Sequence, residues 1–193
     1  VRQQMGECGA LLRLEEYLSS LDDDLTTVDT VVKTGNVMVD AILNSKLSLI
    51  KAREIPLKVK ASVPARTGIG EVELCVIIGN LLDNALESCL LEKEEKEKGE
   101  NAETENVKEA GPVRGPFIRV YIGVLKGQLY ISVANSSCKK VKKIGKSYLS
   151  TKGSRGHGYG LMRIDRIVSK YRGYINRQNE EGAFVTEVML PLG

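Results

Sequence analysis

Apolar and polar residues recur along the chain with two distinct periods. Four stretches place apolar residues at helical spacing and predict helices over 4–21, 36–54, 70–93 and 159–171. Five stretches alternate between apolar and polar residues and predict strands over 57–62, 117–125, 128–134, 173–178 and 183–190. From residue 36 onward the order is helix, strand, helix, hairpin, loop, helix, hairpin. This order predicts an α+β fold, a two-layer α/β sandwich in which helices cover one face of a mixed, mostly antiparallel sheet.

Local signals mark where these elements begin and end. Gly35 and Asn36 precede the second helix, and Pro56 follows it. The dipeptide Lys126-Gly127 separates two alternating stretches, which is typical of a β-hairpin with a two-residue turn.

Two asparagines interrupt the apolar helix over 70–93. Asn80 and Asn84 lie in the segment GNLLDNALESC and, four residues apart, share one helix face. Asparagine is a mediocre helix former, and a buried amide without partners costs about 1–3 kcal/mol. The helix alone leaves two interpretations open: the amides bind a ligand, or they cap and cross-link the core.

A glycine-rich segment immediately precedes the helix over 159–171. Closely spaced glycines let the backbone approach a ligand, and a helix start offers free N–H groups, so the pattern favours a phosphate site. It is neither a Walker A motif nor a Rossmann fingerprint. The segment consists of Gly156, His157, Gly158, Tyr159, Gly160 and Leu161.

The net charge of +3 conceals a strong local separation of charge. Residues 92–109 hold eight Glu and four Lys, whereas 139–155 hold seven Lys or Arg and no acidic residue. The basic segment is suited to attracting an anion. Its single aromatic residue, Tyr148, gives no stacking series, so we expect no nucleic-acid partner.

Cysteine spacing and hydropathy narrow the class of protein. The four cysteines show no CxxC spacing, which argues against a zinc site and a disulfide framework and is typical of a reducing cytosol. No signal peptide is evident, and we expect no apolar run near the roughly 20 residues of a membrane helix. The chain lacks an initial Met and begins within a helical pattern, so we interpret it as a fragment.

The two motifs together resemble the GHKL ATPases, whose ATP site is the Bergerat fold. Asn80-x-x-x-Asn84 is similar to the N box of histidine kinases, and the segment 156–161 to the second glycine box. Residues 181–191 are similar to the closing strand. The resemblance covers about 36–191.

Finer motifs resemble one branch of the sensor histidine kinases, the accessory-gene-regulator-like peptide-pheromone receptors. These motifs are TGNVMVDAILNSK, GNLLDNALESC, STK and HGYGL. The resemblance implies that 1–24 form the C-terminal part of a dimerisation and phosphotransfer hairpin whose phosphoacceptor helix is missing. Residues 25–193 then form the ATP-binding catalytic domain, with an insertion at about 92–115 and an ATP lid at about 136–157.

The resemblance also implies roles for single residues. Asn80 and Asn84 are expected to hold Mg²⁺ and phosphate, without a ranking of the two, because amide oxygens suit that ion. Lys152 is expected to contact phosphate from the lid, and His157 to lie in the lid near the phosphates rather than to accept the phosphoryl group. The glycine box contributes Gly156, Gly158, Tyr159, Gly160 and Leu161.

The residues expected to bind the adenine base depart from the family pattern. The family's first glycine box usually reads Asp-x-Gly-x-Gly, whereas this chain has Asn135-Ser136-Ser137. Asn135 takes the place of the adenine-binding Asp, and an amide accepts a hydrogen bond less strongly than a carboxylate. Thr186, on the last strand, is a further candidate for contact with the adenine edge.

The function that follows is the ATP-binding catalytic domain of a two-component sensor histidine kinase. It is expected to bind ATP with Mg²⁺ and to transfer the γ-phosphoryl group to a histidine outside this fragment. Further expected partners are the phosphoacceptor helix of the same protein, a response regulator and a second copy in a homodimer. The domain is expected to be cytoplasmic, with the full-length protein anchored in the bacterial cell membrane. The alternatives are a degenerate module that binds nucleotide or a partner without turnover, and an anti-sigma-factor-like serine kinase.

Overall fold

The computed structural model divides the chain into two compact units, Val1–Val32 and Lys33–Gly193. The described residues are 31–100, 115–137, 143–144, 147–148, 159–180 and 182–193. The predicted helix over 4–21 and the expected phosphotransfer hairpin over 1–24 lie outside them. The described helices and strands all belong to the second unit.

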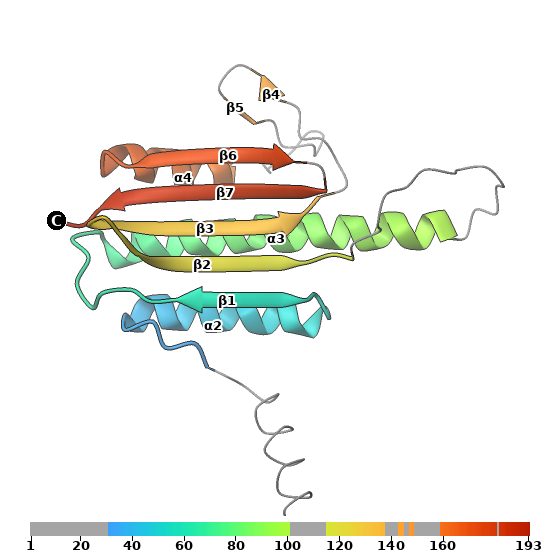
Figure 1. Cartoon of the computed structure of the whole chain (residues 1–193), viewed down its shortest axis with the longest axis horizontal. Coiled ribbons are helices and arrows are strands. Elements are labelled where there is room, and N and C mark those ends of the chain that lie inside the picture. Colours follow the sequence, from blue (N-terminus) through green and yellow to red (C-terminus); the bar gives the residue numbers. More distant parts are fainter. Residues whose placement is uncertain (1–30, 101–114, 138–142, 145–146, 149–158, 181) are drawn as a thin grey trace, which may run out of the picture. The chain divides into compact units, whose positions relative to one another are not determined.

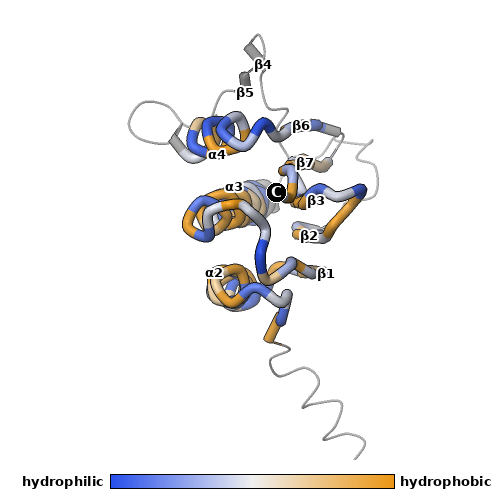
Figure 2. Tube along the Cα trace, turned by 90° about the vertical axis from the view of Figure 1, so that its left-hand side faces the viewer, coloured by the Kyte–Doolittle hydropathy of each residue, from blue (hydrophilic) through white to orange (hydrophobic). Residues whose placement is uncertain are grey.

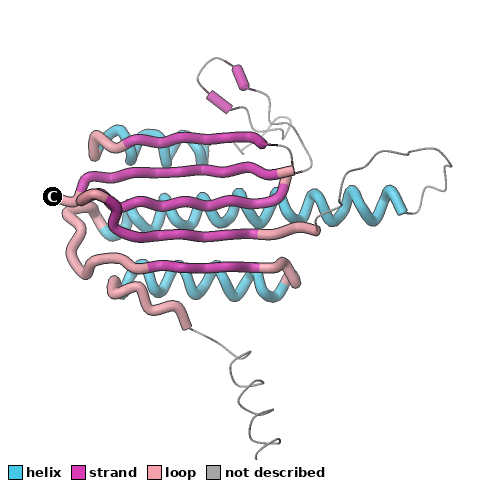
Figure 3. Tube along the Cα trace, viewed as in Figure 1, coloured by secondary structure: helices cyan, strands magenta, loops and turns pink. Residues whose placement is uncertain are grey.

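A five-stranded sheet forms one layer of this unit, in the order β1-β2-β3-β7-β6 (Figure 3). β1 pairs with β2 in parallel, and all the other neighbours are antiparallel. The predicted mixed, mostly antiparallel sheet is therefore confirmed. The strands are β1 (Leu57–Ala61), β2 (Ile118–Leu125), β3 (Gln128–Ser136), β6 (Tyr174–Glu180) and β7 (Ala183–Pro191).

Three helices form the second layer and cover one face of the sheet, as Figure 2 shows along the strands and Figure 1 shows with the sheet in front of the helices. They are α2 (Val37–Ala52), α3 (Glu71–Glu100) and α4 (Tyr159–Lys170). Alternate strand residues and one stripe of each helix meet between the layers and exclude water, which is the main stabilising term of such a fold. The largest fully buried side chains are Leu43, Ile50, Leu74, Ile77, Ile78, Leu82, Ile118, Ile122, Leu129, Ile131, Ile164 and Leu190.

The predicted turn chemistry is present where the sequence indicated it. The Asn36 side chain accepts a hydrogen bond from the Val39 N–H at 3.1 Å and caps α2. Gly35 precedes it with φ 104°. Lys126 and Gly127 have φ values of 50° and 75°, the positive pair that a two-residue hairpin turn requires between β2 and β3.

The structure extends the predictions at several element ends. α3 continues to Glu100, so the first part of the expected insertion at 92–115 is helical. β3 continues two residues beyond the predicted end, to Ser136. A two-stranded sheet, β4 (Lys143–Ile144) with β5 (Ser147–Tyr148), lies within the expected lid and was not predicted from the sequence.

One segment of α3 contradicts the expectation that the chain has no membrane-length apolar helix. Residues Glu71–Glu95 are long and apolar enough, by length and composition, to cross a membrane. In the structure, however, this helix buries Leu74, Ile77, Ile78 and Leu81 in the domain core. We therefore assign its apolar character to the contact between the two layers.

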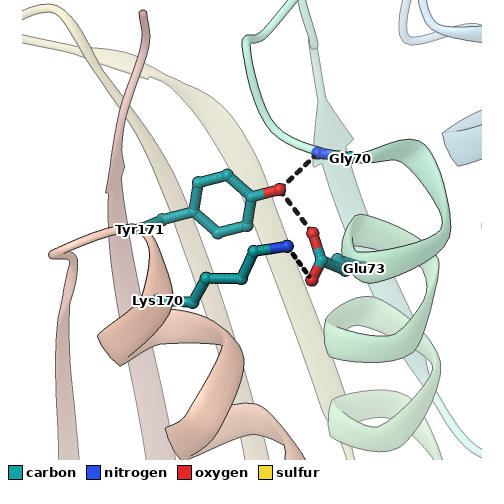
Figure 4. A network of polar contacts seen from close by, with 4 residues as sticks. All are labelled: Gly70, Glu73, Lys170 and Tyr171. Atoms are coloured by element: carbon teal, nitrogen blue, oxygen red, sulfur yellow. Dashed lines mark hydrogen bonds and ion pairs between the residues drawn. The ribbon is translucent and has the colours of Figure 1, made fainter.

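A polar clamp joins the start of α3 to the end of α4 (Figure 4). The Gly70 N–H donates to the Tyr171 hydroxyl oxygen at 2.8 Å, and this hydroxyl donates to Glu73. Lys170 Nζ forms an ion pair with Glu73 Oε1 at 2.7 Å. Because Gly70 and Tyr171 are far apart in the sequence, the clamp fixes the relative position of the two helices that the glycine and asparagine motifs occupy.

Acid should weaken this clamp. The hydrogen bonds from Lys170 and then Tyr171 hold the pKa of Glu73 below its ordinary value of 4.5. A carboxyl group with a lowered pKa contributes stability above its unfolded pKa and loses that contribution as pH falls through the folded value. We expect the unfolding free energy to fall more steeply below pH 4.5 in the wild type than in Glu73→Gln, as measured by urea denaturation across pH 3 to 6. If the unfolding free energies of the two proteins changed equally with pH, the Glu73 carboxylate would not stabilise the domain through the clamp.

Candidate functional site

A polar stripe runs along α3 between two points of contact with other elements. Asn80, Asn84 and Ser88 recur every four residues, so they lie along one side of the helix over about 12 Å. Near Asn80 the stripe meets the first turn of α4, and at Ser88 it meets the end of β3. The stripe therefore connects the glycine motif with the end of the strand that carries Asn135.

Asn80 lies directly against Gly160. A Cβ atom added to Gly160 would lie 2.8 Å from Asn80 Oδ1, closer than real Cβ contacts allow. The Asn80 Nδ2 atom donates to the Val76 carbonyl of its own helix at 2.6 Å, which fixes the amide in place. The structure thus brings together one residue from each of the two motifs, and only glycine fits at position 160 without a rearrangement.

Asn84 is exposed one turn further along α3. Neither asparagine hydrogen-bonds to another element within the part of the chain that the structure describes. The interpretation of the pair as core cross-links is therefore not supported. Asp83, between them, forms an ion pair with Lys46 of α2 at 2.6 Å, so this acid links two helices.

At the other end of the stripe, Asn135 is buried at the end of β3, with 4% of its surface exposed. Its Nδ2 donates to the Ser136 carbonyl oxygen at 2.8 Å, and the Ser88 hydroxyl donates to the same oxygen at 3.0 Å. Thr186 is also buried, on β7, opposite Val133 in the register. Because Val133 and Asn135 share one face of β3, Thr186 and Asn135 face the helix layer from neighbouring strands.

Ser88, Cys89 and Ser136 form a small polar cluster that sequence reasoning missed. Ser136 Oγ accepts from the Phe117 N–H at 3.2 Å and lies 3.4 Å from Cys89 Sγ. Burial, the largest influence, raises the pKa of the Cys89 thiol and keeps it neutral. The available signal was the spacing of Ser88, which continues the stripe of Asn80 and Asn84 by another four residues.

Several predicted site residues lie outside the described residues or are only partly described. Lys152, Gly156, His157 and Gly158 belong to the first group. Tyr159 and Leu161 lie with Gly160 in the first turn of α4, the position predicted for the end of the glycine motif.

The candidate ligands for the implied metal ion are amide oxygens rather than a cluster of carboxylates. Among the described residues, no three His, Cys, Asp or Glu side chains lie close enough together to hold a metal ion. Mg²⁺ in nucleotide sites takes only one or two protein oxygens together with phosphate and water. The Asn80 and Asn84 oxygens match that smaller requirement, with no hydrogen-bond donor on either within the described part.

The contact between Asn80 and Gly160 can be tested without a ligand. We expect Gly160→Ala to lower the free energy of unfolding by about 1 kcal/mol, because the added methyl displaces Asn80 from its bond to Val76. Urea denaturation should show a smaller loss of unfolding free energy when Gly160→Ala is made in an Asn80→Ala background. The reason is that the effects of substitutions at two contacting residues do not add. Equal losses in both backgrounds would contradict the contact.

Comparisons with known proteins agree with the GHKL resemblance. Residues 100–191 match the family model described as the GHKL domain, a stretch that includes Asn135, Gly160 and Thr186 and begins after Asn84. No curated protein matches the sequence significantly.

Solved structures match over most of the chain. The catalytic domain of the histidine kinase ThkA, in a nucleotide-free form, aligns with a TM-score of 0.55 and 16% identity, covering 83% of this chain and 93% of that chain. Another nucleotide-free form of it aligns with a TM-score of 0.53 and 15% identity, covering 80% and 90%. At this level of identity the likeness shows the fold, which is that of histidine kinase catalytic domains.

Proposed function

We propose that this chain is the ATP-binding catalytic domain of a two-component sensor histidine kinase, of the accessory-gene-regulator-like branch. The observation that carries the proposal is the contact of Asn80 with Gly160, because it joins the asparagine and glycine motifs into one site. The fold match to histidine kinase catalytic domains and the GHKL match over 100–191 support it.

Each part of the site has a task in this function. Asn80 and Asn84 offer amide oxygens to Mg²⁺, which neutralises phosphate charge when bound. The start of α4 offers backbone N–H groups and the positive end of a helix dipole to the phosphates. Asn135 accepts a hydrogen bond from the adenine amino group, with Thr186 beside it and Lys152 contributing positive charge from the lid.

The reaction transfers the γ-phosphoryl group of ATP to an imidazole nitrogen of a histidine outside these residues. A nitrogen–phosphorus bond forms, the bond between the γ-phosphorus and the bridging oxygen breaks, and ADP leaves. The domain supplies positioning and charge neutralisation, which are the main requirements of phosphoryl transfer. His157, the one histidine of this sequence, lies within the glycine motif, so we assign it to the lid. We therefore expect these residues by themselves to show little autophosphorylation.

The wider arrangement follows from the same proposal. The acceptor histidine lies on a helix of the same protein, in a hairpin whose second half is 1–24, and the full-length protein is a homodimer in the bacterial membrane. The phosphoryl group then passes to an aspartate of a response regulator. The domain itself faces the cytoplasm, where ATP is available.

Calorimetric titration with a non-hydrolysable ATP analogue, with and without Mg²⁺, tests this function. We expect a dissociation constant between millimolar and micromolar that depends on Mg²⁺, because the ion links phosphate to the asparagine pair. Adding the acceptor helix should then allow phosphohistidine to form. A folded protein that binds no nucleotide under either condition would favour a degenerate module, for which the absence of glycines after Asn135 is the supporting feature.

A further inference from the structure

We propose that Ser88 determines base selectivity by fixing the orientation of the Asn135 amide. The pair then selects a purine with a 6-amino group over one with a 6-oxo group. This inference rests on the proposed function, since it concerns the base of the bound nucleotide. It assigns to Ser88 a positioning role, exerted through Asn135 rather than by contact with the substrate.

The starting observation is that one carbonyl oxygen holds two side chains. The Ser136 carbonyl accepts from Ser88 Oγ at 3.0 Å and from Asn135 Nδ2 at 2.8 Å. A carbonyl oxygen has two lone pairs, so these two donors occupy its capacity. Ser88 comes from α3 and Asn135 from β3, so the carbonyl is shared between the helix layer and the sheet.

The carbonyl itself is held firmly in place. The Ser136 N–H donates to the Phe117 carbonyl at 3.0 Å, and the Phe117 N–H donates to Ser136 Oγ at 3.2 Å. Ser136 has 2% of its surface exposed, and the fully buried Cys89 lies against its hydroxyl. The N–H and hydroxyl of Ser136 are thus bonded to Phe117, the residue before β2, and the bond from Ser88 of α3 keeps its carbonyl directed at Asn135.

This arrangement distinguishes the two ends of the amide. In the observed orientation Nδ2 is bonded to the Ser136 carbonyl, and Oδ1 accepts no hydrogen bond within the described part of the chain. A flip would place Oδ1 against the carbonyl oxygen, so that one hydrogen bond would be lost and two acceptors would face each other. Ser88 strengthens the preference because its donation keeps the carbonyl aligned with the end of the strand.

A fixed acceptor discriminates between purines by their 6-substituent. An adenine amino group donates to Oδ1, whereas a 6-oxo group would meet it as a second acceptor and leave both unsatisfied. A site built to pair a polar group rejects an analogue that cannot pair far more strongly than an apolar pocket does. A carboxylate at this position has two acceptor oxygens, so either of them can face the base. The Asn135 amide has only one, so it must be held with Oδ1 toward the base.

The experiment compares the affinities of analogues of ATP and ITP, whose bases differ at the 6-position, in the presence of Mg²⁺. We expect the wild type to prefer the ATP analogue at least about tenfold, and Ser88→Val to reduce this ratio at least about threefold. Ser88→Thr, which has nearly the same shape as Val but keeps the hydroxyl, should retain the wild-type ratio. Thermal denaturation of the Thr and Val variants establishes that both are folded.

A second pair of variants separates selectivity from general damage to the site. In an Asn135→Asp background, Ser88→Val and Ser88→Thr should show the same ratio, because either carboxylate oxygen accepts. An unchanged ratio in Ser88→Val with Asn135 intact would overturn the inference, as would a wild type that binds both analogues equally. A wild type that binds neither analogue would instead contradict the proposed function.

Discussion

Asn84→Ala is expected to abolish detectable Mg²⁺-dependent nucleotide binding and, at the same time, to raise the stability of the domain slightly. The two effects have opposite signs because Asn84 is poorly suited to its place in α3 unless it binds a ligand. Residues that break a local rule of structure without a compensating contact are expected at functional sites.

The stability effect follows from exposure and helix propensity. Asn84 is exposed, and its side chain makes no hydrogen bond within the described residues. Alanine is the best helix former, and asparagine in a helix interior costs about 0.5 kcal/mol more. The variant should therefore unfold at a slightly higher urea concentration than the wild type.

The loss of binding follows from the role of the amide oxygen. Removing a group that links Mg²⁺ to the protein should weaken binding at least about a hundredfold, or about 2.7 kcal/mol. From a wild-type dissociation constant of about ten micromolar or weaker, that loss takes the constant to about a millimolar or weaker, the limit of calorimetric detection.

A matched control is Glu94→Ala, an exposed position ten residues further along the same helix. It should leave binding of the ATP analogue within twofold of the wild type. Asn84→Ala with wild-type affinity would remove Asn84 from the site. Reduced affinity together with reduced stability would indicate a structural role for its side chain.

Local sequence patterns were sufficient for most of the fold. The alternation over 117–125 and 128–134 and the Lys126-Gly127 turn predicted the hairpin because side-chain period and turn geometry are local properties. The end of α3 was harder to place, since the Glu- and Lys-rich segment can be solvated coil or helix. The structure continues the helix to Glu100, where Glu and Lys four residues apart can support it.

The sequence predicted which residue types form the candidate site, but not which of these residues contact one another. The asparagine and glycine motifs indicated a nucleotide site, whereas the approach of Gly160 to Asn80 depends on how α4 packs on α3. That packing depends in part on the clamp between Glu73 and Tyr171, which no periodicity reveals. Likewise Ser88 gained a role only when the end of β3 was found beside it.

The position of α4 also depends on Gly173, and Gly173→Ala is expected to be the most destabilising of these substitutions. An added Cβ would lie 2.4 Å from the Met189 carbonyl oxygen and 2.8 Å from Leu190 Cδ2. The carbonyl belongs to the backbone of β7, and Leu190 is fully buried, so neither has room to move. Overpacking of this kind costs about 3 kcal/mol.

The backbone around Gly173 restricts relaxation from the other side. The Gly173 N–H donates to the Val168 carbonyl at 2.8 Å and closes the end of α4, while Tyr174 begins the pairing of β6 with β7. A backbone shift that relieves the clash of the added methyl group must therefore break one of two interactions. These are the Gly173–Val168 hydrogen bond at the end of α4 and the pairing of Tyr174 with Met189 between β6 and β7. Both routes also move Tyr171 and weaken the clamp to Glu73.

Urea denaturation checks this prediction, with Gly115→Ala as the matched control. A Cβ at Gly115 would meet no atom of the described residues within 4 Å, so that change should alter the unfolding free energy by at most about 0.5 kcal/mol. A midpoint for Gly173→Ala close to that of Gly115→Ala would mean that β7 and the end of α4 separate easily. In that case α4 could not hold Gly160 against Asn80, and the packing of α4 would not explain the contact between the glycine and asparagine motifs.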